Sequence, residues 1–179
     1  TRHATSKIKK AEDLFEISSM GFRGEALASV AAVSSLTLTS CLHTQEMGHR
    51  LECEGGIRGE PREWQNVKGT TIEVRDLFYN LPVRAKFLKN ETTEWSYCFE
   101  LVQSLAIANP HVSFTLKHND KLRFSSSAAI SDPAEGLLGE AVLRNKAQIV
   151  FTPSEIEHFL YVHKESTYGT WEALISHPG

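Results

Sequence analysis

The sequence predicts an α+β protein of two units, and three observations support this prediction. Residues 35–40 and 69–78 alternate apolar and polar side chains with the two-residue period of half-buried strands. Residues 91–108 carry apolar side chains at the i, i+3, i+4 spacing of an amphipathic helix. After the serine run at 125–127, one helical pattern is followed by successive strand patterns, which places a domain boundary near residue 130.

The composition is typical of a soluble globular protein, with 41% apolar residues, 23% charged residues and a formal net charge of −3. No window of about 20 apolar residues could span a bilayer, so we expect no membrane partner. Because the chain is not basic throughout, contact with nucleic acid requires a local patch. The three cysteines lack metal-ligand spacing, which predicts reduced thiols in a cytoplasmic protein and no metal site.

The chain begins at Thr1 without an initiator methionine and ends at Gly179 without a terminal helix or strand, so we expect an internal fragment of a longer protein. Residues 1–10 concentrate hydroxyl and cationic side chains. Such hydrogen-bond donors suit phosphate oxygens, but the same composition is also typical of a solvated helix end. A short helix is expected over 11–17.

Two glycines, Gly21 and Gly24, flank an aromatic residue and an arginine directly before a helical pattern with Leu27, Val30 and Ala31 on one face. The start of a helix attracts phosphate oxygens through its unpaired N–H groups and its dipole. Glycine can adopt a positive φ and lets the backbone approach a ligand closely. The stretch therefore fits either a phosphate-binding loop or a plain connection between two helices.

A sheet is expected to begin at 35–40 and to continue with a short strand at 50–54 among glycine-rich loops. His43 and His49 in this segment have no carboxylate or cysteine at ligand spacing, which favours solvated loop histidines over metal ligands.

Residues 69–78 are expected to form a central strand with Ile72 and Val74 facing a core. A break at 79–82 precedes a basic helical turn at 83–89. The cations of this turn suit phosphate, DNA or acidic residues, and also plain solvation; they are Arg84, Lys86 and Lys89.

The helix over 91–108 should end at Asn109-Pro110. Its core-facing stripe consists of apolar residues, namely Trp95, Cys98, Phe99, Val102, Leu105 and Ala106. A β-hairpin is expected around Asn119-Asp120.

In the second unit, Asp132-Pro133 suits the start of a helix, because aspartate caps and proline fits the first position. Strands are expected at 147–152, 159–162 and 170–175.

Four runs resemble, in order and spacing, motifs of the MutL family of DNA mismatch-repair ATPases. They are RHATSKI at 2–8, GFRGEALASV at 21–30, GTT at 69–71 with Val74, and DLFYNLP at 76–82. The resemblance covers essentially the whole chain and implies the GHKL-type ATP-binding (Bergerat) fold shared with Hsp90, type II topoisomerases and histidine kinases. That fold is a two-layer α/β sandwich with a mixed sheet, and a transducer domain resembling ribosomal S5 domain 2 follows it. Residues 1–130 would be the C-terminal part of the ATPase domain, and 131–179 the beginning of the transducer domain.

The resemblance also implies site residues for ATP and Mg²⁺. Thr5 and Ser6 would face the phosphates, and Thr70 would lie at the base of the pocket near the adenine. The lid that holds the triphosphate would consist of Gly21, Phe22, Arg23, Gly24, Glu25, Ala26 and Leu27. By the same resemblance, the Arg23 side chain would either bind phosphate or instead brace the lid or the dimer.

The family's general base, its magnesium-binding asparagine and its adenine-reading aspartate correspond to positions before Thr1, and a phosphate-binding lysine to a position after Gly179. The chain alone is therefore expected to contain no catalytic residue or metal ligand and to be inactive as an ATPase. The family often has a second arginine where this chain has Ala85, which puts the role of that position in doubt.

For the parent protein, the resemblance implies ATP-driven lid closure and N-terminal dimerisation that couple mismatch recognition to downstream repair. The implied partners are a MutS-type mismatch-recognition protein, DNA, and a second subunit in a homodimer or heterodimer, in the cytoplasm of a bacterium or the nucleus of a eukaryote. Two alternatives remain open. One is a DNA-binding or scaffold module without nucleotide, and the other is a different GHKL ATPase, such as a topoisomerase or chaperone.

Overall fold

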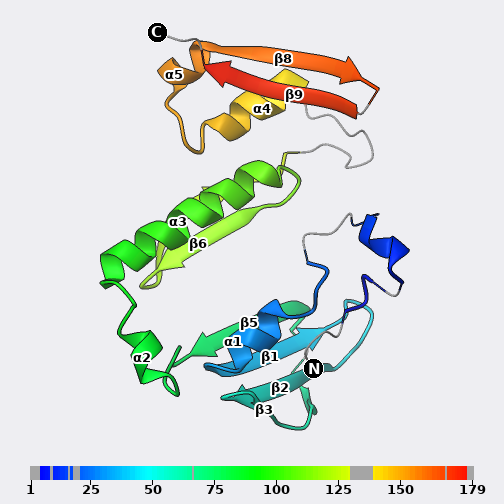
Figure 1. Cartoon of the computed structure of the whole chain (residues 1–179), viewed down its shortest axis with the longest axis vertical. Coiled ribbons are helices and arrows are strands. Elements are labelled where there is room, and N and C mark those ends of the chain that lie inside the picture. The colour runs from blue at the N-terminus through cyan, green and yellow to red at the C-terminus, as the bar shows by residue number, and fades with distance from the viewer. Residues whose placement is uncertain are drawn as a thin grey trace. The chain divides into compact units, whose positions relative to one another are not determined.

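The computed structural model describes residues 5–8, 10–15, 17, 21–65, 67–129, 139–167 and 169–176. Contacts divide the chain into two compact units, Thr1–Lys89 and Asn90–Gly179, whose elements are shown in Figure 1. By these contacts, the long helix over 91–108 and the hairpin after it belong to the second unit. The division between the units therefore lies earlier in the chain than the domain boundary near residue 130 that the sequence suggests. That domain assignment stays a prediction. None of the helices in the described part of the chain has the length and apolar character needed to cross a membrane.

The first unit contains a five-stranded sheet in the order β3-β2-β1-β5, with β4 also paired to β2. The strands are β1 (Ser35–Cys41), β2 (Gly48–Glu54), β3 (Ile57–Arg58), β4 (Arg62–Trp64) and β5 (Gly69–Arg75). The resemblance implies a mixed sheet, whereas every strand pair among the described residues is antiparallel. Strands β1 to β4 follow one another through short connections, which favours antiparallel pairing among them because a parallel pair needs a longer crossover.

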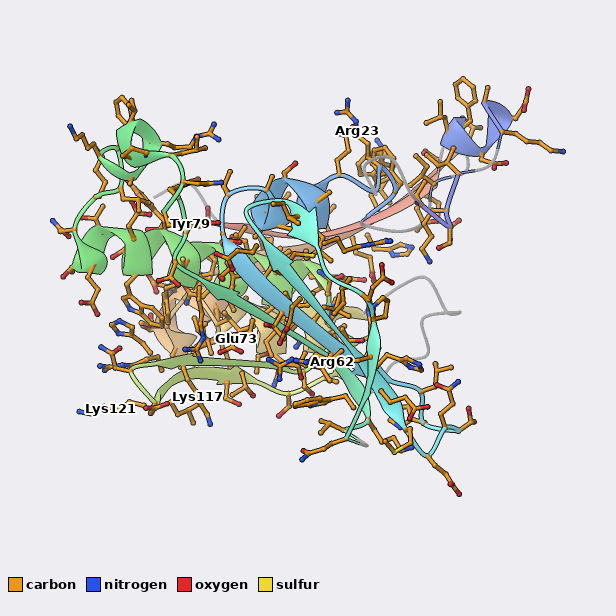
Figure 2. All side chains as sticks on the ribbon, turned by 90° about the horizontal axis from the view of Figure 1, so that it is seen from below. Arg23, Arg62, Glu73, Tyr79, Lys117 and Lys121 are labelled. Atoms are coloured by element: carbon orange, nitrogen blue, oxygen red, sulfur yellow. The ribbon has the colours of Figure 1, made fainter. Side chains whose placement is uncertain are left out.

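Cross-strand partners lie on the same face of a sheet. The register of β1 with β2 and β5 therefore gives this sheet one mainly apolar face and one polar face. Leu36 pairs with Cys53 and Val74, and Leu38 pairs with Leu51 and Ile72, which builds the apolar face. On the opposite face lie polar residues such as Thr37, Glu52 and Glu73. Figure 2 shows Glu73 and Arg62 on the side of the sheet away from helix α1 (Ala26–Ala31).

The prediction of a central strand at 69–78 is wrong. Among the described residues β5 pairs only with β1, and it lies at an edge of the sheet. Ile72 and Val74 are 48% and 42% exposed, whereas Leu36 on the middle strand is 3% exposed. The alternation correctly assigned these side chains to the apolar face, but a periodic pattern does not report how much of that face is covered.

Three short helices among the described residues complete the first unit. The helix expected over 11–17 is a 3₁₀ turn at η1 (Glu12–Phe15), with Phe15 91% exposed. Helix α1 follows the glycine loop as expected, although Leu27 is 41% exposed and only Ala31 of the predicted stripe is buried. The basic turn begins with α2 (Pro82–Ala85), which has proline in its first turn.

In the second unit, α3 (Glu91–Ala108) has the predicted bounds. The Asn90 side chain caps it by accepting from the Thr93 amide at 2.9 Å. The hairpin of β6 (Phe114–His118) and β7 (Lys121–Ser126) is also confirmed. Ring contacts join helix and hairpin, because Trp95 stacks on His118 with 4.3 Å between ring centroids.

The prediction of a core-facing stripe on α3 is wrong for one of its members, because Cys98 is exposed. At the turn of the hairpin, Asn119 and Asp120 have φ values of 49° and 60°, which the two-residue turn requires.

The remaining elements are α4 (Gly139–Ala147), α5 (Pro153–Glu157), β8 (Phe159–Ser166) and β9 (Gly169–Ser176). The two strands confirm the predictions at 159–162 and 170–175. The predicted strand at 147–152 is wrong, because Phe151 N donates to Ala147 O at 2.9 Å and continues the turn of α4. Thr152 then caps α5 in a capping box with Glu155. The helix start expected at Asp132-Pro133 lies outside the described residues.

Candidate functional site

A cavity of about 1250 Å³ lies in the first unit, between the glycine loop and the apolar face of the sheet. Its lining comes from three parts of the chain: the polar segment 5–7, the loop and helix 21–32, and strands β1 to β3. Segments far apart in sequence therefore meet around one space.

The structure brings together all but one of the predicted site residues. Those that line the cavity are Thr5, Ser6, Gly21, Phe22, Arg23, Gly24, Glu25, Ala26 and Leu27. The remaining residue, Thr70, lies on β5 opposite Ser40, with 2.9 Å between the two hydroxyl oxygens. Both are on the apolar face of the sheet, two residues along from Leu38 and Ile72. Thr70 thus shares the face on which the cavity lies without lining it.

The loop before α1 has the geometry that its glycines suggest. Gly24 has a φ of +67°, a region that side chains with a Cβ rarely adopt. The first intrahelical bond runs from Ser29 N to Glu25 O at 2.8 Å. The amides just before Ser29 belong to the first turn and have no acceptor within the helix by geometry. They give the cavity a set of backbone donors.

The side chain of Arg23 does not point into the site as a free cation. Its Nε lies 3.0 Å from the Glu25 carboxylate, and the side chain is 76% exposed. Figure 2 shows Arg23 projecting from the loop, away from the sheet. In this structure Arg23 pairs within the loop, which matches the bracing role considered from the sequence.

The polar segment is arranged by its own hydroxyls. The Lys7 amide donates to Thr5 Oγ1 at 3.1 Å, a local turn that threonine commonly forms. Thr5, Ser6 and Lys7 all line the cavity. A hydroxyl-rich turn with a lysine beside backbone donors suits an anionic group.

Sequence reasoning missed the floor of the cavity and one of its cations. The floor is apolar and consists of Leu36, Leu38, Leu51 and Cys53. The alternating pattern of β1 could have identified Leu36 and Leu38 as residues of one apolar face. Their pairing with Cys53 and Leu51 of β2 depends on the strand register, which the pattern does not give. Arg58, on the two-residue strand β3, also lines the cavity. No sequence pattern marks a single arginine in a glycine-rich turn.

The lining therefore combines an apolar floor with a polar, cationic rim. Among the described residues, the lining cations are Lys7, Arg23 and Arg58, and the lining carboxylate is Glu25, which pairs with Arg23. Such a surface suits a ligand with a flat apolar part and an anionic part. The described residues include no group of three His, Cys, Asp or Glu that could hold a metal ion.

Outside the cavity, the basic turn after β5 offers a weaker candidate for anion binding. The Arg84 guanidinium lies over the Phe78 ring, 5.6 Å from its centroid. This packing places the cation on the protein's own aromatic surface, as arginine commonly does.

Comparison with curated proteins finds close similarity to mismatch-repair proteins. The chain is 44% identical over 140 residues to the DNA mismatch repair protein MutL of Neisseria meningitidis serogroup B, across 78% of this chain and 21% of that protein. It is 39% identical over 178 residues to MutL of Dictyoglomus turgidum, across 99% of this chain and 29% of that protein. The chain thus spans between a fifth and a third of the length of these relatives. No family model matches the chain.

Among solved structures, the chain is similar to the Aquifex aeolicus MutL ATPase domain complexed with ADP. The TM-score is 0.66 at 28% sequence identity, over 96% of this chain and 61% of that one. This likeness confirms the predicted α+β fold of GHKL-type ATPase domains.

Proposed function

Because the chain belongs to the MutL family of DNA mismatch repair proteins, we propose that the cavity of its first unit binds the phosphates of ATP. The observation that carries the proposal is the meeting of the hydroxyl-rich segment 5–7 and the glycine loop 21–27 around one cavity. A related ATPase domain, from Aquifex aeolicus, is described as complexed with ADP. Both segments offer donors for phosphate oxygens.

Each part of the lining takes a role in this proposal. The amides of the loop and of the first turn of α1 bind the triphosphate, and the hydroxyls of Thr5 and Ser6 add donors. Lys7 and Arg58 supply positive charge. The apolar floor excludes water beside the ligand, which strengthens these polar interactions. Thr70, held by Ser40 on the same face, would lie near the adenine.

The cavity residues fit phosphate better than they fit a metal ion. Within the described lining, the carboxylate is that of Glu25, and it pairs with Arg23. Mg²⁺ prefers carboxylate oxygens, water and phosphate, so its protein ligands would have to come from other residues than those that line this cavity. We therefore assign phosphate binding and positioning to this chain, and expect no ATP hydrolysis by residues 1–179 alone.

For the longer protein we propose a role in DNA mismatch repair, in which ATP binding closes the loop 21–27 as a lid and promotes dimerisation of the N-terminal regions. Hydrolysis would use positioning and charge neutralisation of the terminal phosphate. MutS-type proteins and DNA are the partners in this scheme. We assign the second unit to the beginning of the transducer domain. The support for these proposals is the similarity to proteins named MutL, of which the chain spans a minor part.

The test compares two glycine substitutions in the full-length protein. Gly24 and Gly139 have nearly equal φ values of 67° and 71°, so valine strains the backbone similarly at both. Only Gly24 lines the cavity. Gly24→Val should abolish ATP binding in calorimetric titration and ATP-dependent dimerisation in analytical ultracentrifugation, whereas Gly139→Val should retain both.

Wild-type ATP affinity in the Gly24→Val protein would overturn the phosphate-site proposal. The competing proposal of a DNA-binding module without nucleotide makes a different prediction. It requires DNA affinity that falls steeply with salt and does not respond to ATP.

A further inference from the structure

Helix α1 has six residues, Ala26–Ala31, and follows the glycine loop directly. A helix this short is not stable in isolation, so its position depends on what holds its ends. Ala28 and Ala31 of this helix line the cavity, as does Ala32 just after it. Any shift of α1 would therefore move the cavity wall and the loop at its N-terminal end together.

Hydrogen bonds hold the C-terminal end of α1 and the two residues that follow its C-cap, Ala32. Four consecutive carbonyls accept from outside the helix: Ala31 O from Gly56 N at 2.8 Å, Ala32 O from Asn80 Nδ2 at 3.0 Å, Val33 O from Phe78 N at 2.7 Å, and Ser34 O from Gly55 N at 3.1 Å. Helix ends normally leave such carbonyls to water or to a capping turn. Here the β2–β3 turn and the segment 76–80 satisfy them.

Asn80 differs from the other three donors because it donates through a side chain. The other donors are backbone amides, which substitution leaves in place. A carboxylate at position 80 would keep the shape of the side chain, but it could not donate and would repel the carbonyl of Ala32.

The backbone around Asn80 is held in a conformation that it would not adopt alone. Asp76 and Phe78 have φ values of 51° and 67°, which are uncommon for residues with a Cβ. Such conformations persist where surrounding bonds determine them, and the bond from Phe78 N to Val33 O is one of these. The segment 76–80 and the end of α1 therefore stabilise each other.

We propose that Asn80 is a positioning residue for the phosphate site. Its bond to Ala32 O holds the C-terminal end of α1, and so orients the loop 21–27 at the other end of the same short helix. This inference rests on the proposed function of that loop. It gives the run at 76–82 a role in nucleotide binding although the cavity lining does not include Asn80.

The test is Asn80→Asp in the full-length protein, with Asn90→Asp as the matched control. Asn90 uses only its side-chain oxygen, as the cap of α3, so an aspartate serves there equally well. Hydrogen exchange of the amides at 29–33 reads the position of α1 without nucleotide. Titrations with ATP and with adenosine read the site, because only ATP carries the phosphates that the loop would contact.

We expect Asn80→Asp to speed exchange at 29–33 and to weaken ATP binding by roughly two- to tenfold, the range for one lost hydrogen bond, while adenosine binding is unchanged. Asn90→Asp should leave all three measurements at wild-type values. Unchanged exchange or unchanged ATP affinity in Asn80→Asp would overturn the inference, as would an equal loss for adenosine. If the aspartate prevents folding, Asn80→Ala removes the donor without adding charge, and the same criteria apply.

The outcome is separable from that of the proposed function. If Gly24→Val also binds ATP normally, the phosphate site itself is wrong. If Gly24→Val loses ATP while Asn80→Asp keeps it, only the positioning role is wrong.

Discussion

Gly55 sits where the β2–β3 turn meets the segment 76–80, and its substitution tests that contact. Its φ is +54°, and a Cβ added there would lie 2.6 Å from the Tyr79 hydroxyl, well inside the 3.4 Å at which ordinary contact begins. Gly55→Ala therefore requires both a strained backbone and a displaced Tyr79 side chain. The backbone strain alone should lower the free energy of unfolding of the first unit by about 1–2 kcal/mol.

The displacement of Tyr79 can be measured separately. Partial desolvation and a hydrogen bond to Glu54 raise the pKa of the Tyr79 phenol above its usual value. If the alanine pushes the hydroxyl off Glu54, that pKa should move back toward 10. Because this pKa is raised in the folded state, it stabilises the fold below pH 10, and the stabilisation is lost as the pH rises through the folded-state pKa. Gly55→Ala should make this pH dependence shallower.

The assay is urea unfolding followed by the fluorescence of Trp64, in a chain whose other two tryptophans, Trp95 and Trp171, are phenylalanine. Tyr79→Phe removes the hydroxyl that the new Cβ would meet, so Gly55→Ala should cost less in that background. Equal costs in both backgrounds would refute the claim that the turn and Tyr79 are in close contact.

Two further predictions concern other parts of the chain. Leu36→Ala should destabilise the first unit by about 2–5 kcal/mol in the same assay, because the side chain is buried on the middle strand, whereas Ile72→Ala on the exposed edge strand should cost much less; similar costs would contradict the sheet order. Hydrogen bonds from Thr152 lower the pKa of Glu155, so the capping box should stabilise α5 above the unfolded-state pKa of the carboxyl and lose this effect as the pH falls through the folded-state pKa. NMR titration of Glu155 in wild type and in Thr152→Ala checks this sign: the variant should move the pKa only part of the way back toward its ordinary value, because it loses the hydroxyl while the amide of residue 152 still donates to the Glu155 carboxylate.

Local signals account for the elements that the sequence predicted well. Helix α3 has a capping asparagine before it and Asn109-Pro110 after it, so both ends are encoded within a few residues. The hairpin turn at Asn119-Asp120 is likewise local, because these residues tolerate positive φ. The prediction of a strand at 147–152 failed because a short apolar run fits a strand and a helix end equally well. In the structure, the end of α4 continues into this segment.

The candidate site also contains parts that local sequence signals predict and parts that they do not. The polar and glycine-rich segments at 5–7 and 21–27 could be identified from residue chemistry, and they do line one cavity. Arg58 and the pairing of β1 with β2 that forms the floor could not, since both depend on strand register. The role of 76–80 at the end of α1 was equally invisible, because its bonds join residues far apart in sequence.

Hydrogen exchange of the full-length protein with and without ATP tests whether the segments 5–7 and 21–27 bind the nucleotide together. We expect ATP to slow exchange in two separate segments, 5–7 and 21–28, at the same nucleotide concentration. Saturating ATP that protects neither segment, or that protects only residues outside the first unit, would contradict it.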